Sequence, residues 1–119
     1  MGKPSRDKGA RGEREWAAEC RSQGYTDAVR TAQHAGKNGG EADVKGLPGL
    51  HVEVKRTEAL RLHDAIVQAK RDAKDGALPV VAHRRNNDEW LVSMPASTFF
   101  EIYREYVSGF SLENELNGG

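Results

Sequence analysis

One segment with a two-residue repeat constrains the fold of this chain more than any other feature. In Leu50–Arg56, which reads Leu-His-Val-Glu-Val-Lys-Arg, apolar and polar side chains alternate, and this alternation is typical of a half-buried β-strand. The two valines point to one face, while His51, Glu53 and Lys55 point to the other. Glu53 and Lys55 therefore stand about 6.6 Å apart along one face, given a rise of about 3.3 Å per residue.

A turn sequence precedes this strand and places a second strand beside it. Gly46-Leu47-Pro48-Gly49 separates residues 50–56 from a strand predicted at residues 42–45. We expect these two strands to pair as an antiparallel hairpin. Asp43 then lies on the neighbouring strand, close enough for its carboxylate to meet that of Glu53.

Further periodic segments complete an alternating order of helices and strands. Apolar side chains at three-to-four-residue spacing predict helices at about 7–24 and 60–74 and a last helix after Pro95, whose apolar stripe is Phe99, Ile102, Tyr103 and Tyr106. Short apolar runs predict further strands at 28–32, 78–82 and 89–93. The order αβββαββα fits an α/β protein with a central mixed five-stranded sheet flanked by helices. A chain of 119 residues has room for one domain, here with a loose leader at about 1–6 and a frayed tail at about 112–119.

Composition and charge limit the possible classes of function. The chain carries 18 Lys and Arg against 18 Asp and Glu, so its net charge gives no indication of nucleic-acid binding. Basic residues nevertheless gather near the N-terminus and at His83-Arg84-Arg85, a group predicted to lie in a turn. Both a basic face and an ordinary mixed surface stay open. No apolar run is long enough to span a membrane, the first residues lack the apolar segment of a signal peptide, and the single Cys20 excludes an internal disulfide. We expect an intracellular protein of the cytoplasm or nucleoid.

Asp43, Glu53 and Lys55 together supply the groups that phosphodiester hydrolysis needs. Mg²⁺ prefers oxygen ligands and is commonly held by one or two carboxylates together with phosphate oxygens and water. There it activates water and offsets the charge that develops on phosphorus. A lysine beside the carboxylates can orient the nucleophile or bind the same phosphate. Taken alone, the pattern equally suits a solvent-facing strand edge, and both interpretations stay open.

The first predicted helix adds a third carboxylate. Glu13 precedes Trp16, Ala17 and Cys20 at helical spacing, so it lies on the inward stripe, whereas Glu15 lies off that stripe and is expected to face solvent. A carboxylate on an apolar face is costly unless it is paired or binds a metal. The alternative is that Glu13 sits in the first helical turn, where the helix dipole favours a negative charge.

These residues resemble the PD-(D/E)XK nuclease superfamily. The resemblance covers roughly residues 8–106 and rests on Arg11-Gly12-Glu13-Arg14-Glu15-Trp16 opening a helix, Arg30 in the next strand, Asp43, and Glu53-Val54-Lys55. Within the superfamily the chain is most similar to the archaeal-type Holliday junction resolvases, which are small homodimers of this length. It departs from the motif in two places: Glu41-Ala42-Asp43 stands where Pro-Asp is usual, and a Gly-rich loop at residues 34–40 precedes the aspartate.

The resemblance implies a site as well as a fold. Glu13, Asp43, Glu53 and the Val54 carbonyl would surround Mg²⁺, for which Mn²⁺ can substitute, and Lys55 would be the catalytic lysine. Gln68 and His51 would border the site, with a solvated glutamine and an edge histidine as the alternatives. Phosphate contacts are expected from a set of basic residues, namely Arg11, Arg14, Arg30, Lys37, Arg56, Arg84 and Arg85.

The function implied by the resemblance is cleavage of branched DNA by a homodimeric, Mg²⁺-dependent endonuclease. A four-way (Holliday) junction presents two symmetry-related phosphates, which suits a two-fold dimer with one site per subunit, and contacts mainly to phosphates would position the protein without reading sequence. Three alternatives stay open: a nicking, restriction or repair nuclease of the same superfamily, a non-catalytic DNA-binding module, and an α/β scaffold protein that binds no nucleic acid.

Overall fold

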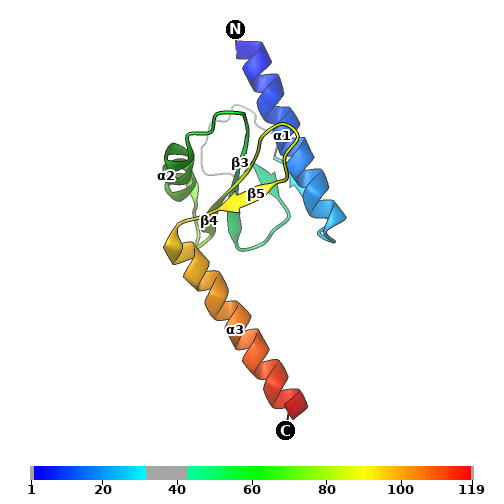
Figure 1. Ribbon diagram of the computed structural model, residues 1–119, viewed down its shortest axis with the longest axis vertical. Helices are drawn as coiled ribbons and strands as arrows, with labels where there is room; N and C mark the ends of the chain where they lie inside the picture. Colours follow the sequence, from blue (N-terminus) through cyan, green and yellow to red (C-terminus); the bar gives the residue numbers. More distant parts are fainter. Residues whose placement is uncertain (1, 32–42, 119) are drawn as a thin grey trace.

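The computed structural model describes residues 2–31 and 43–118, with side chains over residues 9–31 and 43–110. The Gly-rich loop at 34–40, and Lys37 within it, lies outside the described residues. Helices and strands follow one another in the predicted order αβββαββα, which confirms the α/β class. The elements are α1 Gly2–Ser22, β1 Val29–Arg30, β2 Val44–Lys45, β3 Leu50–Arg56, α2 Leu62–Asp72, β4 Leu78–Arg84, β5 Leu91–Ser93 and α3 Ala96–Gly118 (Figure 1).

The helices at the two ends are longer than the sequence pattern predicts. α1 begins at Gly2 rather than near Asp7, and α3 continues to Gly118. Residues 2–6 and 112–118 are therefore helical, where the sequence pattern predicts a loose leader and a frayed tail.

The strands form two sheets rather than the predicted single five-stranded sheet. β1 and β2 pair antiparallel as a two-stranded sheet. The second sheet is mixed, with the order β3-β4-β5. In it β3 and β4 run parallel, from Leu50 opposite Leu78 to Arg56 opposite Arg84, whereas β4 and β5 are antiparallel. Because β4 extends to Arg84, His83 and Arg84 lie in a strand and not in the predicted turn.

The predicted hairpin between residues 42–45 and 50–56 is wrong, because β2 pairs with β1 instead of β3. Asp43, which immediately precedes β2, links it to β3 in a different way. Its N–H donates to the Val52 carbonyl at 3.1 Å, and its Oδ2 accepts a hydrogen bond from the Val54 N–H at 2.7 Å. The side-chain carboxylate thus occupies the place that a backbone carbonyl has in a regular ladder. The two sheets meet at Asp43 without continuing into each other.

α1 covers one face of β3 and β4 and forms the larger core with them. The buried residues of this core are Trp16, Ala17, Cys20, Ala28, Val44, Val52, Val54, Val80 and Ala82. The ring of Trp16 also meets that of Trp90, with centroids 5.1 Å apart. Gly12 allows α1 to approach β3 closely, since a Cβ at this position would lie 2.5 Å from the Cβ of Arg56.

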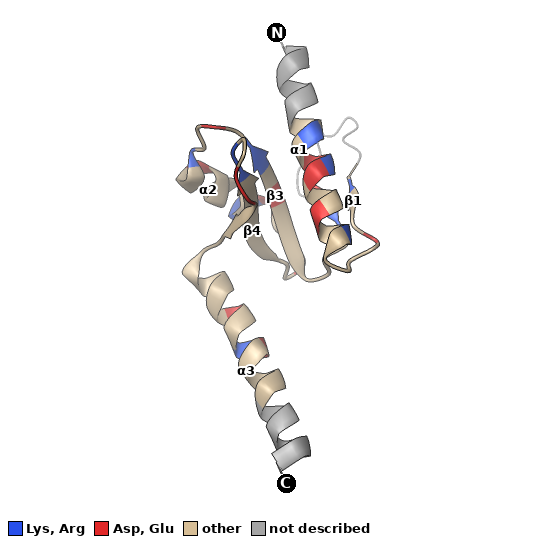
Figure 2. Ribbon diagram, turned by 45° about the vertical axis from the view of Figure 1, so that its right-hand side comes forward, with Lys and Arg blue, Asp and Glu red and all other residues tan. Residues whose placement is uncertain are grey.

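α2 covers the opposite face of the same strands. Its Ala65 and Ala69 are buried against Val81, and the helix provides the crossover that the parallel pair β3 and β4 requires. Figure 2 shows β3 and β4 lying between α1 and α2. Because side chains alternate along a strand and Val52 and Val54 face α1, Glu53 and Lys55 face α2.

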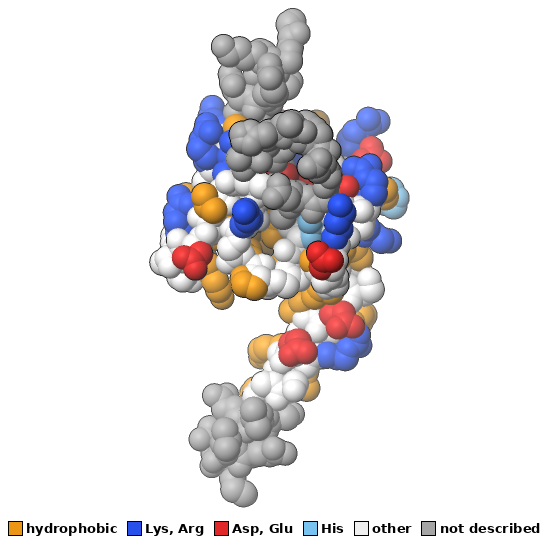
Figure 3. All heavy atoms as spheres, turned by 180° about the vertical axis from the view of Figure 1, so that it is seen from behind, with side chains coloured by type: hydrophobic (Ala, Val, Ile, Leu, Met, Phe, Trp, Pro, Cys, Tyr) orange, Lys and Arg blue, Asp and Glu red, His pale blue; other side chains and the backbone are white. Residues whose placement is uncertain are grey.

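α3 projects away from the rest of the molecule (Figure 1). It is fixed near its start, where the buried Thr98 donates a hydrogen bond from Oγ1 to the Pro79 carbonyl at 3.3 Å. The molecule measures 63 × 28 × 25 Å, and its radius of gyration of 16.0 Å exceeds the roughly 13.5 Å expected of a compact domain of this length. Apolar side chains are visible along the described part of α3 in Figure 3. Among the described helices, none is long and apolar enough to cross a membrane.

Candidate metal centre

Seven of the predicted site residues line one pocket of about 400 Å³. α1, β3, α2 and the residue that precedes β2 all contribute to it. The lining residues are Gly9, Glu13, Asp43, Glu53, Val54, Lys55, Arg56, Thr57 and Gln68. The pocket therefore brings together the four residues predicted to be catalytic, which come from positions 13 to 55 of the sequence.

Asp43 is hydrogen-bonded to the backbone of β3 in this site. The N–H of Val54 points at the Asp43 carboxylate, and the N–H and C=O of one residue point to the same side of a strand. The Val54 carbonyl therefore faces the same edge as Asp43, away from β4. This is the edge at which the resemblance places a backbone ligand.

Asp43 carries a carboxyl group whose proton affinity is unusually high. Burial raises the pKa of Asp43 to about 7, and the nearby negative charge of Glu53 adds to the rise. Glu13 contributes in the same direction, while the Val54 N–H and the Lys55 ammonium oppose it. At neutral pH the Asp43 carboxyl group therefore either holds a proton or is negatively charged beside Glu53 and Glu13. A bound divalent cation would offset the repulsion between these carboxylates.

Glu53 is almost completely buried, with 2% of its surface exposed, and both of its oxygens have partners. Oε1 lies 2.9 Å from His51 Nε2, and Oε2 accepts a hydrogen bond from Gln68 Nε2 at 3.2 Å. Gln68 in turn accepts one from Lys55 Nζ at 3.1 Å. Two alternatives from the sequence are therefore wrong: although β3 is the outer strand of its sheet, neither Glu53 nor His51, itself 3% exposed, faces solvent.

Glu13 points from α1 towards the same pocket and pairs with a predicted phosphate-binding arginine. Its Oε1 accepts a hydrogen bond from Arg30 Nε at 2.6 Å, and the Glu13 side chain is 13% exposed. Because α1 begins at Gly2, Glu13 is not in the first helical turn, and the alternative of a dipole-stabilised, solvated glutamate is wrong. Its charge is compensated by Arg30.

One close group of potential ligand atoms includes a residue that the sequence pattern did not indicate. Among the described residues, His51, Glu53 and Asp72 have ligand atoms all within 4.8 Å of one another. Glu13, Asp43 and Glu53 do not form a second such group in this part of the chain. Glu13 and Glu53 are each turned to another hydrogen-bond partner. The donor set itself suits a hard cation, since three carboxylates and a carbonyl line one pocket.

Asp72 lies at the end of α2 and is the functional candidate missed by the sequence analysis. It follows Gln68 by four residues, so both side chains lie on the same face of the helix. Arg71 donates a hydrogen bond to it from Nε at 3.0 Å and holds the pKa of Asp72 below its usual range. The four-residue spacing from Gln68 is the signal that was available in the sequence.

Several predicted phosphate-binding arginines are paired within the chain. Glu15, predicted to face solvent, accepts a hydrogen bond from Arg56 Nε at 2.9 Å and lies 3.5 Å from Arg84 and 3.4 Å from Arg11. Burial raises the pKa of Glu15, but Arg56, Arg11 and Arg84 together outweigh this effect, and the pKa is lowered.

The last two predicted arginines lie at the surface. Arg85 pairs with Asp88 at 3.2 Å, and Arg14 is exposed. Both side chains are therefore accessible to a phosphate.

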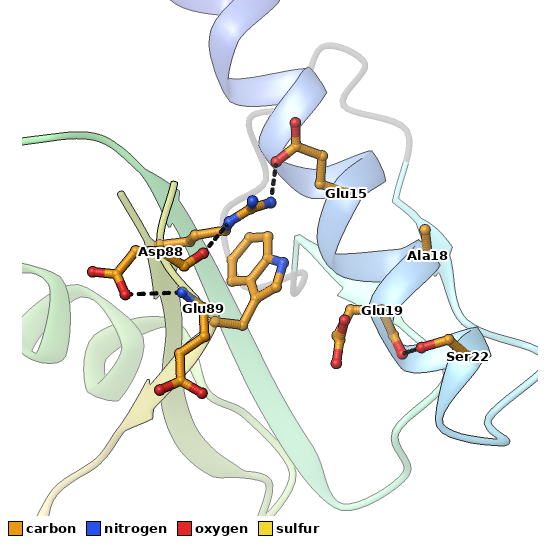
Figure 4. Close-up of a pocket in the computed structure, with 8 residues that line it drawn as sticks. Glu15, Ala18, Glu19, Ser22, Asp88 and Glu89 are labelled. Atoms are coloured by element: carbon orange, nitrogen blue, oxygen red, sulfur yellow. Dashed lines mark hydrogen bonds and ion pairs between the residues drawn. The ribbon is translucent and has the colours of Figure 1, made fainter. Parts of the chain in front are cut away.

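A larger pocket of about 550 Å³ is lined by residues of α1 and by the segment from Arg84 to Trp90. Figure 4 shows its acidic lining, with Glu15, Glu19, Asp88 and Glu89 around it. Four carboxylates against one arginine, Arg84, disfavour a polyanion. The smaller pocket beside Asp43 is therefore the better candidate for phosphate chemistry.

Comparisons with protein-family models, with curated proteins and with solved structures find no match to this chain.

Proposed function

We propose that this chain is a Mg²⁺-dependent endonuclease of the PD-(D/E)XK kind, with a restriction-endonuclease-like fold. We further propose that it cuts branched DNA, four-way junctions in particular, as a homodimer. The observation that supports the proposal best is the position of Asp43. It is hydrogen-bonded to the backbone of β3 in the pocket that Glu13, Glu53 and Lys55 also line.

The cation would be held by oxygen atoms that the fold already concentrates. Asp43, Glu53 and the Val54 carbonyl are the proposed ligands, with Glu13 at the α1 side of the same pocket. When bound, Mg²⁺ supplies an activated water and offsets negative charge at the phosphorus. The raised pKa of Asp43 supports this assignment, because a site built only for structural stability has no need of a carboxyl group whose charged form is destabilised by burial and by two other carboxylates.

Lys55 has the position expected of a residue that acts on the nucleophile or the phosphate. It follows Glu53 on the same face of β3, and one of its three N–H groups is directed to Gln68 Oε1. The remaining two are free of hydrogen bonds to the described side chains and can hold an attacking water or the scissile phosphate. Gln68 and His51 act as positioning residues, because each is hydrogen-bonded to Glu53.

Contacts with DNA would be made mainly to phosphates around the pocket. Arg30 lies beside Glu13 and is partly exposed, and Arg14 is exposed on α1. Such contacts position a protein on DNA without selecting sequence. Selection of a junction would come from the spacing of two identical sites in a two-fold dimer.

The direct test compares two acid-to-amide variants of the purified protein. Glu53→Gln should abolish cleavage of a labelled four-way junction in Mg²⁺ and should lower Mg²⁺ binding measured by calorimetry. DNA binding should stay equal or become tighter, because one negative charge near the phosphates is removed. Asp64→Asn is the matched control, since the Asp64 side chain is 70% exposed on α2, and it should cleave like the wild type. Full cleavage by Glu53→Gln would overturn the proposal.

A further inference from the structure

α3 presents a continuous apolar surface that nothing in the described part of the chain covers. We call this surface the α3 stripe. Its members are Phe99, Phe100, Ile102, Tyr103, Tyr106, Val107 and Phe110, each between 37% and 66% exposed. Figure 3 shows apolar side chains along this helix where it leaves the body.

The α3 stripe is confined to one side of the helix. At about 100° per residue, its seven members fall within an arc of about 160°. The opposite side carries Glu101, Arg104, Glu105 and Ser108. Within the stripe, Phe99, Tyr103, Tyr106 and Phe110 recur at alternating steps of four and three residues, which is the spacing of a helix-packing seam.

Neighbouring rings of the seam already stack on one another. The centroid distance is 6.0 Å between Phe99 and Tyr103 and 6.1 Å between Tyr103 and Tyr106. The seam is therefore a pre-arranged row of aromatic faces and not a set of unrelated exposed side chains.

The exposed area is of the size that a dimer interface needs. With ~200 Å² for a whole aromatic side chain, the α3 stripe exposes roughly 650 Å². Monomeric proteins rarely leave more than a few hundred Å² of contiguous apolar surface uncovered, and a standard interface buries about 800 Å² on each partner. The stripe alone supplies most of that area.

The charged residues of α3 lie outside the α3 stripe, so the stripe suits an apolar partner surface such as a second α3 stripe. Arg104 donates a hydrogen bond to Glu101 at 2.8 Å on the polar side, and the stripe contains no charged residue. A nucleic acid would need basic residues here, so it is not the partner that the stripe fits. An apolar seam on a projecting helix is complementary to a second copy of the same seam, as an isologous interface requires.

We infer that the α3 stripe is the surface through which two copies of this chain associate, with α3 of one copy packed against α3 of the other. The proposed function assumes a homodimer, and this inference, argued from α3 alone, assigns the surface that forms it. It also supplies the two-fold arrangement that cleavage at paired phosphates requires.

The test is the mass of the full chain in solution, measured by light scattering over a wide range of protein concentration. The wild type should have twice the mass of one 13.1 kDa chain. Tyr103→Glu places a charge in the seam and should give a monomer, whereas Ser108→Glu places the same charge on the polar side and should stay dimeric. Thermal unfolding followed by circular dichroism checks that both variants are folded.

A wild type that is monomeric at all concentrations would overturn the inference, since the stripe would then be covered by the chain itself or by another partner. A dimer that survives both Tyr103→Glu and Phe110→Glu would overturn it too, because association would then use another surface. A monomeric wild type would also contradict the homodimer in the proposed function, but neither outcome bears on Mg²⁺-dependent cleavage, which the Glu53→Gln assay tests separately.

Discussion

Replacing Asp43 by asparagine should stabilise the metal-free protein, and the gain should depend on pH. Asparagine has nearly the shape of a protonated aspartate, and its carbonyl can still accept the hydrogen bond from the Val54 N–H. It removes the charge that burial and Glu53 disfavour. The variant therefore separates the electrostatic cost of this site from its packing.

The magnitude and sign follow from the pKa of Asp43, which rises from 3.8 to about 7 on folding. Between these values the folded protein binds the extra proton, so the free energy of unfolding of the wild type falls as pH rises. At about pH 8 the cost reaches roughly 4 kcal/mol, at about 1.4 kcal/mol per pKa unit. The advantage of Asp43→Asn should therefore be largest at about pH 8 and should shrink by about 1.4 kcal/mol per pH unit between about pH 7 and pH 5.

The assay is urea denaturation of wild type and Asp43→Asn in EDTA at several pH values, with Asp64→Asn as the exposed control. The control should change stability by less than about 0.5 kcal/mol at every pH. Adding Mg²⁺ should stabilise the wild type and leave Asp43→Asn unchanged, because a ligand stabilises only the state that binds it. The Asp43 carboxylate does not carry this electrostatic cost if Asp43→Asn is less stable than the wild type at about pH 8, or if the stability difference between the two proteins is the same at both ends of the pH range.

Three further predictions concern packing, positioning and charge. Gly12→Ala should lower the free energy of unfolding by roughly 1–3 kcal/mol and remove most activity, because the new Cβ meets Arg56 and pushes α1 away from β3. Gly9→Ala has open space around the new Cβ and should be neutral or slightly stabilising in the same denaturation assay. His51→Ala should raise the Mg²⁺ concentration for half-maximal cleavage by about 10–100-fold, the usual effect of removing a group that orients a metal ligand; an unchanged Mg²⁺ dependence would exclude a positioning role. Junction binding, followed by fluorescence anisotropy, should weaken steeply with salt, and a flat response would contradict phosphate contacts.

The types and order of the elements could be predicted because they depend on neighbouring residues. The alternation of Val52 and Val54 with polar residues identifies β3, and the spacing of Trp16, Ala17 and Cys20 identifies α1. Strand pairing could not be predicted in the same way. Gly46 begins a plausible hairpin turn, and its positive φ of 113° is also common in such turns.

The pairing of β2 with β1 depends on a contact between residues that are far apart in the sequence. A Cβ on Gly46 would lie 2.5 Å from the Cα of Ala28, so this glycine brings the end of β2 against the start of β1. The composition of a turn does not contain that information. A hairpin and this arrangement look alike in the local sequence.

The candidate site was predictable to the same extent. Glu13, Asp43, Glu53 and Lys55 meet in one pocket. A local period places Glu13, Glu53 and Lys55 on their own helix or strand, whereas Asp43 reaches the pocket through its hydrogen bonds to β3 and not through the predicted hairpin. The hydrogen-bond partners of the residues in and around the site could not be predicted. Glu15 and Arg56 are 41 residues apart in the sequence, and an inward-facing histidine has the same local pattern as an edge histidine.

The exposure of the α3 stripe could not be predicted from the sequence for a different reason. An apolar stripe has the same period whether it packs into the core of its own chain or against another molecule. The sequence therefore predicts the stripe but not what covers it.

Metal-dependent cleavage is tested by incubating three labelled DNAs with the purified protein. A four-way junction, a linear duplex and a single strand would each be incubated with Mg²⁺ or with EDTA. We predict paired, symmetric nicks in the junction that require Mg²⁺ and are lost in Glu53→Gln. Cleavage of all three DNAs would keep the nuclease and remove the junction preference. If the protein binds the junction tightly but leaves all three DNAs intact in both Mg²⁺ and Mn²⁺, the proposed activity is contradicted, and the chain is a DNA-binding module.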